Sequence, residues 1–290
     1  MPLATPLLYS GVALIWGSTW LAITFQLGET APLASVIYRF GLATVMLFVW
    51  CLWKKIDVRM NRRQHVLMGV QGTFLFGLNY WVLYLATEHL TSGLIAAVFT
   101  TIVFFNALNG RLFLALPVRR GVLVGGAIGL AGVAMLFVRE IEGFTLTGES
   151  GAGMLLALLA TLLASLGNIA AAKNISGGRS VLVINAWAML YGTVVMIVAA
   201  VVLGVEFSLD GRLSYWLSLG YLSLFGSLFT FAGYLRLIAI LGPDKAGYMS
   251  MLVPVIALGL SSVFEGYMWT PAAMAGLVCI LFGNWVALRR

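Results

Sequence analysis

The chain has 290 residues, of which 61% are hydrophobic and 9% are charged, and its net charge is +7. A soluble domain carries about a quarter charged residues, so this composition excludes a water-soluble protein and predicts helices that span a lipid bilayer. The basic residues stand in short clusters between apolar segments, which is typical of membrane topology and argues against a nucleic-acid partner. Cys51 and Cys279 lie inside apolar segments, so we expect buried thiols, with neither a disulfide nor a metal site.

Ten apolar segments separated by polar residues predict an all-α integral membrane protein with ten transmembrane helices. Most prolines near these segments fall at or close to a helix start, where a missing N–H group costs nothing. Pro254 lies deep inside the ninth segment instead, and predicts either a static kink or a gate hinge. In chain order the predicted helices are 5–25, 31–53, 65–86, 91–114, 118–138, 152–173, 181–203, 213–238, 245–264 and 270–288.

Basic residues predict the orientation of these helices. Of the 17 Lys and Arg residues, all except Arg39, Arg139 and Arg212 fall on the side of the predicted spans that also holds both chain ends. Cytoplasmic loops carry such an excess of basic residues, so we expect both termini in the cytoplasm, as in a multi-pass bacterial inner-membrane protein. The first residues lack a basic n-region, so the first helix is expected to stay in the mature protein.

The two halves of the chain resemble each other. The glycine-rich segment 125–132 of the fifth helix is similar to segment 275–283 of the tenth, and a Val-Ala pair follows each. With five helices per half, the second half would insert with the opposite orientation, as in transporters that rock about a midplane site. We therefore predict two inverted five-helix repeats, residues 1–143 and 144–290, around a central cavity. The fifth helix also has a face of small residues that favours close helix packing, formed by Gly121, Gly125, Gly129 and Gly132.

Several short motifs carry a family resemblance that covers the whole chain. They are Trp16-Gly17-Ser18-Thr19-Trp20, Tyr38-Arg39-Phe40, the segment from Gly125 to Leu136, and Pro254-Val255 with Glu265. With these motifs the chain resembles the ten-helix EamA-type exporters of the drug/metabolite transporter superfamily. Within that superfamily the chain is most similar to the bacterial aromatic amino acid exporters, which share its aromatic-rich third helix (Asn79-Tyr80-Trp81, Tyr84).

The resemblance has two departures. Val103 and the region of Leu114 stand where the family often has a proline in the fourth helix and a Gly-Glu pair at its end. The matching positions of the ninth helix keep Pro254 and Glu265. We therefore expect the two halves to bend unequally.

Polar and aromatic side chains at helical spacing predict the lining of the cavity. Polar and aromatic groups gain nothing by facing the lipid. We therefore expect the stripes of such residues on the first, third, sixth and eighth helices to face the interior of the bundle. Ordinary packing between helices is the alternative interpretation of each stripe. The predicted lining residues are Trp16, Trp20, Asn79, Tyr80, Tyr84, Phe99, Thr101, Ser165, Asn168, Tyr234, Tyr248 and Met251.

Arg39 lies about 12 Å inward along the second helix, at ~1.5 Å per residue, where an unpaired cation is costly. One hypothesis makes it the counter-charge for a substrate carboxylate. The other gives it a structural bond to backbone carbonyl groups or to a carboxylate such as Glu88. The structural hypothesis is favoured here, because the resemblance implies that an Arg-Phe pair recurs in exporters with diverse substrates.

The acidic residues fall in loops or at helix ends, and no phosphate-binding loop is present. This pattern predicts a facilitator-like exporter without a cofactor, or one that couples through an edge carboxylate such as Glu88 or Glu265. Neutral aromatic and other hydrophobic amino acids suit an uncharged aromatic pocket. The choice of amino acids rests mainly on the resemblance. The pattern does not indicate an oligomeric state, and a monomer is compatible with it.

Four alternatives stay open at this point. A multidrug exporter of lipophilic compounds would use the same aromatic pocket. A sugar-phosphate exchanger needs basic residues in the cavity, and Arg39 is the one candidate. An intramembrane serine protease would need Ser150, in a Gly-x-Ser-Gly pattern, to meet His65 or His89 within the membrane. A structural membrane subunit would carry no substrate. We expect a transporter and not an enzyme.

Overall fold

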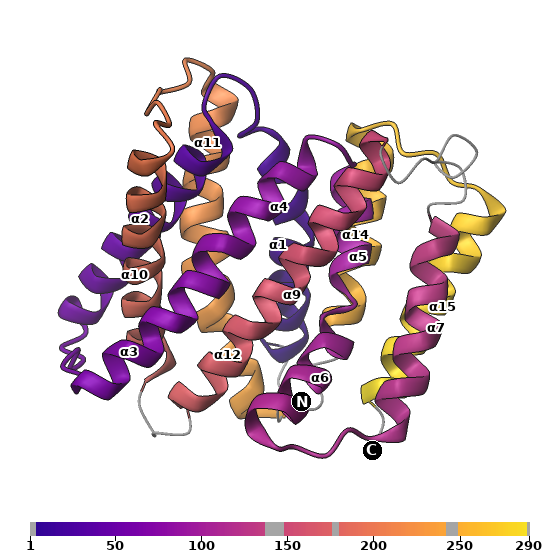
Figure 1. Cartoon of the computed structure of the whole chain (residues 1–290), viewed down its shortest axis with the longest axis horizontal. Coiled ribbons are helices and arrows are strands. Elements are labelled where there is room, and N and C mark those ends of the chain that lie inside the picture. The colour runs from indigo at the N-terminus through magenta and orange to yellow at the C-terminus, as the bar shows by residue number, and fades with distance from the viewer. Residues whose placement is uncertain (1–3, 137–147, 176–179, 242–248, 289–290) are drawn as a thin grey trace.

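The computed structural model describes residues 4–136, 148–175, 180–241 and 249–288, and these form helices joined by short turns, with no strand among them (Figure 1). The helices are α1 (Ala4–Thr24), α2 (Pro32–Trp53), α3 (Arg62–Gln71), η1 (Gly72–Leu78), α4 (Asn79–Thr87), α5 (Ser92–Phe99), α6 (Ile102–Leu114), α7 (Arg120–Leu136), α9 (Glu149–Ile175), α10 (Val181–Val202), α11 (Leu213–Ser223), η2 (Leu224–Phe229), α12 (Thr230–Leu241), α14 (Met249–Phe264) and α15 (Pro271–Leu288).

Seven continuous helical stretches are long and apolar enough to cross a bilayer. Two of them contain π-helical turns, which join α3 to α4 through η1 and α11 to α12 through η2. The shorter apolar helices lie in α7, α14 and α15. The all-α membrane fold is therefore confirmed, and each predicted span finds its counterpart within a few residues.

The start of α3 shows how the sequence sets a helix boundary. The Asn61 side chain accepts a hydrogen bond from the Gln64 amide N–H at 2.8 Å, and the Gln64 side chain accepts one from the Asn61 N–H at 3.0 Å. This reciprocal capping satisfies two N–H groups that the helix leaves free. The third span therefore begins at Arg62, three residues earlier than its apolar pattern predicts.

The third and eighth spans are not continuous α-helices, so the prediction of unbroken α-helical spacing through them was wrong. Side chains bond to carbonyl oxygens that the π-helical turns would leave less well satisfied. In the third span, Asn79 Nδ2 donates to the Leu75 oxygen at 3.1 Å. In the eighth, the Ser227 hydroxyl donates to the Leu222 oxygen at 3.1 Å, five residues back.

The fourth and ninth spans differ in continuity, and the break lies in the span without the proline, opposite to what the missing proline suggests. The fourth span breaks at Thr100 and Thr101, between α5 and α6, although it has no proline. Both threonine hydroxyls donate to carbonyl oxygens three residues back, at 2.7 and 2.8 Å. The ninth span, α14, runs continuously across Pro254.

Glycines bring α7 and α15 into backbone contact at one edge of the bundle (Figure 1). A Cβ at Gly125 would lie 2.2 Å from the Gly283 oxygen, and one at Gly132 would lie 2.5 Å from the Gly276 oxygen. Only glycine permits this approach, so the predicted contact face is confirmed at these positions. Gly129 differs, because a Cβ there would meet nothing within 4 Å.

The Trp16–Trp20 motif in α1 serves several neighbouring helices at once. A Cβ at Gly17 would lie 2.4 Å from Ile256 Cγ2, so the glycine admits α14. The Ser18 hydroxyl is hydrogen-bonded to the Tyr221 hydroxyl of α11 at 2.7 Å. Thr19 packs over Gly226 of η2, where a Cβ would lie 2.9 Å from the threonine methyl group. The small residues therefore fit α1 among its neighbours, and the two indoles fill the space on either side.

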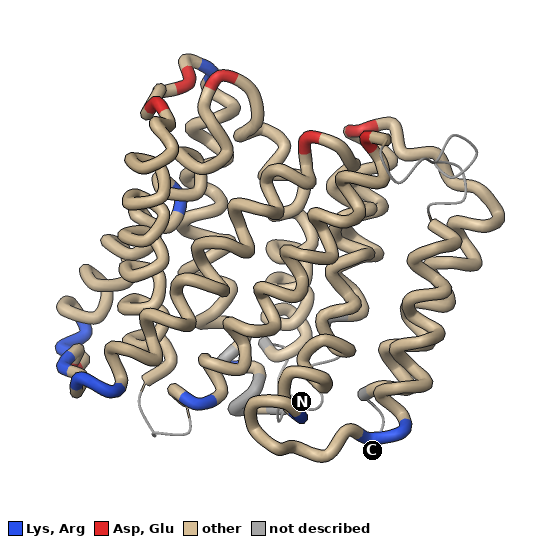
Figure 2. Tube along the Cα trace, viewed as in Figure 1, with Lys and Arg blue, Asp and Glu red and all other residues tan. Residues whose placement is uncertain are grey.

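Charge separates the two ends of the bundle (Figure 2). Lys and Arg gather at the end where α1 begins and α15 ends, which we call the basic end. Glu29, Glu88, Glu149 and Glu265 lie in or beside the turns at the opposite end, which we call the acidic end.

Candidate functional site

Aromatic rings form a line of contacts through the bundle. Tyr234 of α12 lies 5.0 Å from Trp16 of α1, measured between ring centroids, and Trp16 lies 6.2 Å from Phe231. Phe231 lies 6.2 Å from Phe76 of η1, which is 5.5 Å from Phe40 of α2. Phe40 lies 4.7 Å from Tyr80 of α4. We call these six residues the aromatic line, and all its spacings fall in the range of favourable ring pairs.

Arg39 stands at the Tyr80 end of the aromatic line. Its guanidinium carbon lies 4.6 Å from the Tyr80 ring centroid and 5.1 Å from that of Phe40. Its Nη1 donates to the Tyr84 hydroxyl at 3.5 Å, and its side chain is only 2% exposed. The two acceptors expected from the sequence, a backbone carbonyl group or Glu88, are not among the described contacts of its side chain.

Gln26 completes this group from the turn after α1. The Tyr84 hydroxyl donates to Gln26 Oε1 at 2.5 Å, and both residues are fully buried. Gln26 Nε2 and Arg39 Nε have no hydrogen-bond partner in the described part of the chain. Two buried donors without acceptors therefore flank one tyrosine hydroxyl.

The remaining predicted lining residues fall into separate places. Trp20 lies 5.2 Å from Phe99 of α5, so these two rings pair apart from the aromatic line. Ser165 accepts a hydrogen bond from Asn109 at 2.9 Å, and Asn168 donates to Asn106 at 3.4 Å, which joins α9 to α6. For both polar residues the packing interpretation describes the observed contacts.

Asn79 is buried and bonds within its own span, while its Oδ1 has no partner among the described residues. Pro254 is buried and Met251 is half-buried in α14. Tyr248 falls outside the described residues.

Two cavities are described, and both lie away from the aromatic line. One of about 10 Å³, room for a single water molecule, lies between α6 and the α7–α15 pair and has Thr101 in its wall. The other, of about 210 Å³, lies at the acidic end and is lined by Thr91, Leu136, Gly266, Tyr267, Met268, Thr270 and Ala273. Along the aromatic line the rings contact each other, so a guest needs them to move apart.

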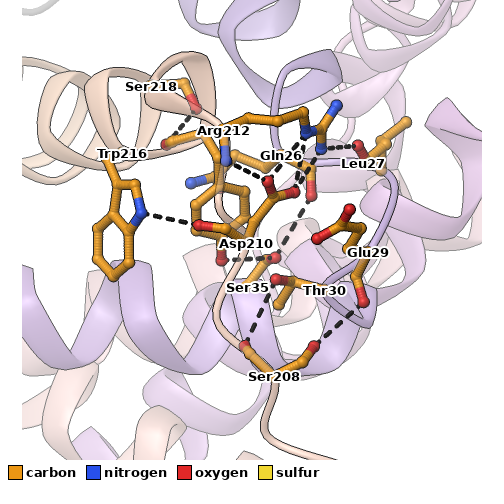
Figure 3. A network of polar contacts seen from close by, with 11 residues as sticks. Gln26, Leu27, Glu29, Thr30, Ser35, Ser208, Asp210, Arg212, Trp216 and Ser218 are labelled. Atoms are coloured by element: carbon orange, nitrogen blue, oxygen red, sulfur yellow. Dashed lines mark hydrogen bonds and ion pairs between the residues drawn. The ribbon is translucent and has the colours of Figure 1, made fainter.

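Polar contacts join the first and eighth spans at the acidic end (Figure 3). Arg212 forms an ion pair with Asp210 at 2.5 Å and donates to the Leu27 oxygen at 2.6 Å. Trp216 Nε1 donates to the backbone carbonyl oxygen of Asp210 at 2.8 Å. Gly28 adopts a φ of 131° and leaves no room for a Cβ, which would lie 2.7 Å from Arg212 Nη2. The turn after α1 is thereby fixed against the turn before α11.

The hydrogen bonds from Arg212 hold the pKa of Asp210 below its ordinary value of 3.8. A depressed pKa contributes stability that is present above the ordinary value and is lost as the pH falls through the folded value. We therefore expect Asp210→Asn to lower the apparent Tm in detergent by the same amount at pH 5 and at pH 8. A decrease that differs between these two pH values would contradict this assignment.

Glu265 joins the fourth and ninth spans at the same end. Its carboxylate accepts the Ser92 amide N–H at 3.0 and 3.1 Å and also accepts a short hydrogen bond from the Ser92 hydroxyl. The carboxylate therefore caps the N-terminus of α5, where helix N–H groups are free and the dipole favours negative charge.

Removing this cap should be measurable. Because a lost cap costs ~0.5–2 kcal/mol, we expect Glu265→Ala to lower the apparent Tm by about 2–6 °C. Glu88→Ala is the matched control, since the Glu88 side chain is exposed at the same end, and it should leave the Tm unchanged. Equal effects of the two substitutions would exclude the cap.

Some residues of this region were not predicted from the sequence. Phe40, Phe76 and Phe231 connect Trp16 to Tyr80, but their spacing does not distinguish them from lipid-facing phenylalanines. Gln26, just past the predicted end of the first helix, was not singled out either.

The comparisons agree on one family. The model of the EamA-like transporter family matches residues 4–138 and again 151–289. The uncharacterized inner membrane transporter YedA of Escherichia coli is 28% identical over 279 residues, which cover 93% of this chain and 85% of that protein. The uncharacterized transporter YoaV of Bacillus subtilis is 25% identical over 253 residues, covering 85% and 84%.

A probable amino-acid metabolite efflux pump of Salmonella typhimurium is 23% identical over 283 residues, covering 95% of this chain and 91% of that protein. One crystal structure matches with a TM-score of 0.68 at 19% identity, covering 98% of this chain and 96% of that one, which shows a shared fold. Because the family model covers nearly all of both halves, the chain belongs to the EamA-like transporter family and is a membrane transporter.

Proposed function

We propose that this transporter exports neutral aromatic and other hydrophobic amino acids from the cytoplasm by alternating access. The basic end faces the cytoplasm of a bacterial cell, with both termini there, because basic residues are retained on that side of the membrane. The two repeats, residues 1–143 and 144–290, rock about the aromatic line and open it to each side in turn. The relative named as a probable amino-acid metabolite efflux pump is consistent with this substrate class.

Several features support the two inverted repeats. The family model matches once in each half, and the π-helical turns η1 and η2 fall in the third span of each. Counterpart spans pack against each other, as α2 with α10, α5 with α14 and α7 with α15.

Polar clusters also occur at opposite ends of corresponding spans. Near the basic end, Asn174 and Asn185 bond to Gln71 at 2.8 and 3.1 Å and join the sixth, seventh and third spans. Near the acidic end, Ser35 and Tyr215 bond at 3.0 Å and join the second and eighth spans. An inverted repeat requires this exchange of ends.

The observation that carries the substrate class is the aromatic line itself. Its rings come from α1, α2, η1, α4 and α12, so it is shared by both halves, and rings bind rings without requiring a charge. Within the described membrane-spanning helices, the acidic residue is Glu149 in the first turn of α9, at the acidic end. A lipophilic cation would lack an anionic partner at the line, whereas a zwitterionic amino acid needs none.

The same distribution of acidic residues supports a facilitator that runs down the gradient of its substrate. Proton-driven exporters use a carboxylate inside the membrane, which the described aromatic line lacks. Opening of the acidic end would require the contacts of Glu265 with Ser92 and of Arg212 with Leu27 to separate.

Efflux from proteoliposomes tests this proposal. We expect saturable efflux of phenylalanine and tryptophan, at rates that change less than about twofold when a pH gradient is imposed. Efflux of a lipophilic dication without amino acid efflux would support a multidrug exporter instead. A many-fold acceleration by a proton gradient would contradict the facilitator mechanism, and no flux of any of these compounds would contradict the proposal as a whole.

A further inference from the structure

Arg39 is a buried cation whose described contacts include no carboxylate. A guanidinium has five N–H donors, yet among the described residues this side chain donates only to the Tyr84 hydroxyl, at 3.5 Å. The rings of Tyr80 and Phe40 attract the charge but accept no in-plane hydrogen bond. Burying a cation in this state is costly, and a buried donor without an acceptor needs a physical reason.

A second unsatisfied donor lies in the same group. Gln26 Oε1 accepts the Tyr84 hydroxyl, which leaves its Nε2 without a partner among the described residues, and Gln26 is fully buried. Both orphan groups, Arg39 Nε and Gln26 Nε2, are donors. This group therefore lacks an acceptor, and the positive charge of Arg39 favours a negative one.

A residue without a side chain lies beside the guanidinium. Gly226 of η2 faces Arg39, and a Cβ at this glycine would lie 3.7 Å from Arg39 Nη2. The same Cβ would collide with the Thr19 methyl group at 2.9 Å, so a larger residue does not fit there without movement. Tyr80 and Phe40, at one end of the aromatic line, also contact the guanidinium.

We propose that Arg39, Gln26 and Tyr84 form a carboxylate-binding subsite at the end of the aromatic line. A planar carboxylate offers two acceptors to the guanidinium edge, and the Gln26 amide supplies a further donor. A ring on the same ligand would then lie along Tyr80 and Phe40. This inference rests on the proposed function, and it restricts the substrate class to compounds that carry both a ring and a carboxylate.

The sequence favoured a structural role for Arg39, because the resemblance implies that an Arg-Phe pair recurs in exporters with diverse substrates, and that role has backbone carbonyl groups or Glu88 as acceptors. Neither of these is among the described contacts of its side chain, so the structure favours the carboxylate hypothesis. An inorganic anion such as chloride would satisfy the same donors, so the test includes both sources of negative charge.

A binding assay separates the subsite from transport. The apparent Tm of the detergent-purified protein is measured with phenylacetate, with phenylacetamide and with chloride, each against the same buffer free of carboxylate and halide ions. We expect phenylacetate to raise the Tm at concentrations at least about tenfold lower than phenylacetamide, since one charge-assisted bond gives about that factor. In Arg39→Gln the ratio of the phenylacetamide concentration to the phenylacetate concentration that gives the same Tm increase should fall to near one. Arg39→Lys should keep an intermediate ratio. Arg212→Gln, a basic residue outside the group, should keep the wild-type ratio.

Each outcome decides one question. Equal shifts by phenylacetate and phenylacetamide in the wild-type protein would overturn the subsite, even where Arg39→Gln does not fold. Stabilisation by chloride alone would also overturn it and would indicate an inorganic anion site. Carboxylate-dependent stabilisation without amino acid efflux would keep the subsite and contradict the proposed substrates. Phenylalanine efflux with an unchanged half-saturating concentration in Arg39→Gln would keep the proposed function and contradict the subsite.

Discussion

Gly125→Ala is expected to reduce the amount of folded transporter several-fold and to lower the apparent Tm of the remaining folded protein. The added methyl group would lie 2.2 Å from the Gly283 oxygen and 2.7 Å from the Ala287 nitrogen, so α7 and α15 must separate. Both obstacles are backbone atoms, which cannot rotate away, and overpacking of this kind costs ~1–3 kcal/mol or more. The α7–α15 contact is also the most extensive between any two helices of the described chain.

Gly129→Ala is the matched control in the same helix, one turn away. A Cβ at this position would meet nothing within 4 Å, and alanine favours a helix over glycine by about 1 kcal/mol. Size-exclusion profiles and thermal unfolding in detergent compare the two variants. Gly125→Ala with a wild-type profile, or Gly129→Ala that is equally damaged, would contradict backbone contact between α7 and α15.

Trp16→Leu is expected to raise the half-saturating concentration for phenylalanine efflux about tenfold. The indole lies in the aromatic line, where it contacts both Phe231 and Tyr234. Each favourable ring pair contributes ~0.5–1.5 kcal/mol, so the loss of one ring that binds the substrate should weaken its affinity about tenfold. Leucine keeps an apolar side chain, so the fold should be retained. Efflux rates over a range of internal phenylalanine concentrations give the measurement.

Trp53→Leu controls for the general loss of an indole. Trp53 ends α2 at the basic end, is 68% exposed and stacks with Lys54 at 4.0 Å, away from the aromatic line. This variant should keep wild-type kinetics. If the two tryptophan variants transport alike, Trp16 has no part in substrate binding.

Much of the architecture was predictable because lipid imposes a simple rule. A span needs ~20 apolar residues, so the polar residues between apolar segments are enough to locate the helices. For example, the predicted helix 31–53 corresponds to the observed helix Pro32–Trp53. The small-residue face of the fifth helix was equally predictable, since only glycine allows two helix backbones to touch. At Gly125 and Gly132 the backbones of α7 and α15 are in contact. The charged ends followed from the placement of basic residues.

The site was less predictable, for two physical reasons. Helical spacing assumes 3.6 residues per turn, and the π-helical turns in η1 and η2 rotate the later residues of each span about the helix axis. The stripes predicted on the third and eighth helices therefore do not stay on one face. Partners on different helices also leave no local trace, so neither the Tyr84–Gln26 bond nor the contact between Phe76 and Phe231 could be read from spacing. Arg39 was identified from its depth alone, but its partners were not.

The aromatic line as the substrate path is the central claim, and photolabelling tests it most directly. The purified transporter is irradiated with 4-azidophenylalanine, and the labelled peptides are mapped by mass spectrometry with and without excess phenylalanine. We expect labels on the segments of α1, α4 and α12 that carry Trp16, Tyr80 and Phe231, and we expect phenylalanine to suppress them. Labels confined to other segments, or labels that phenylalanine does not suppress, would contradict the account.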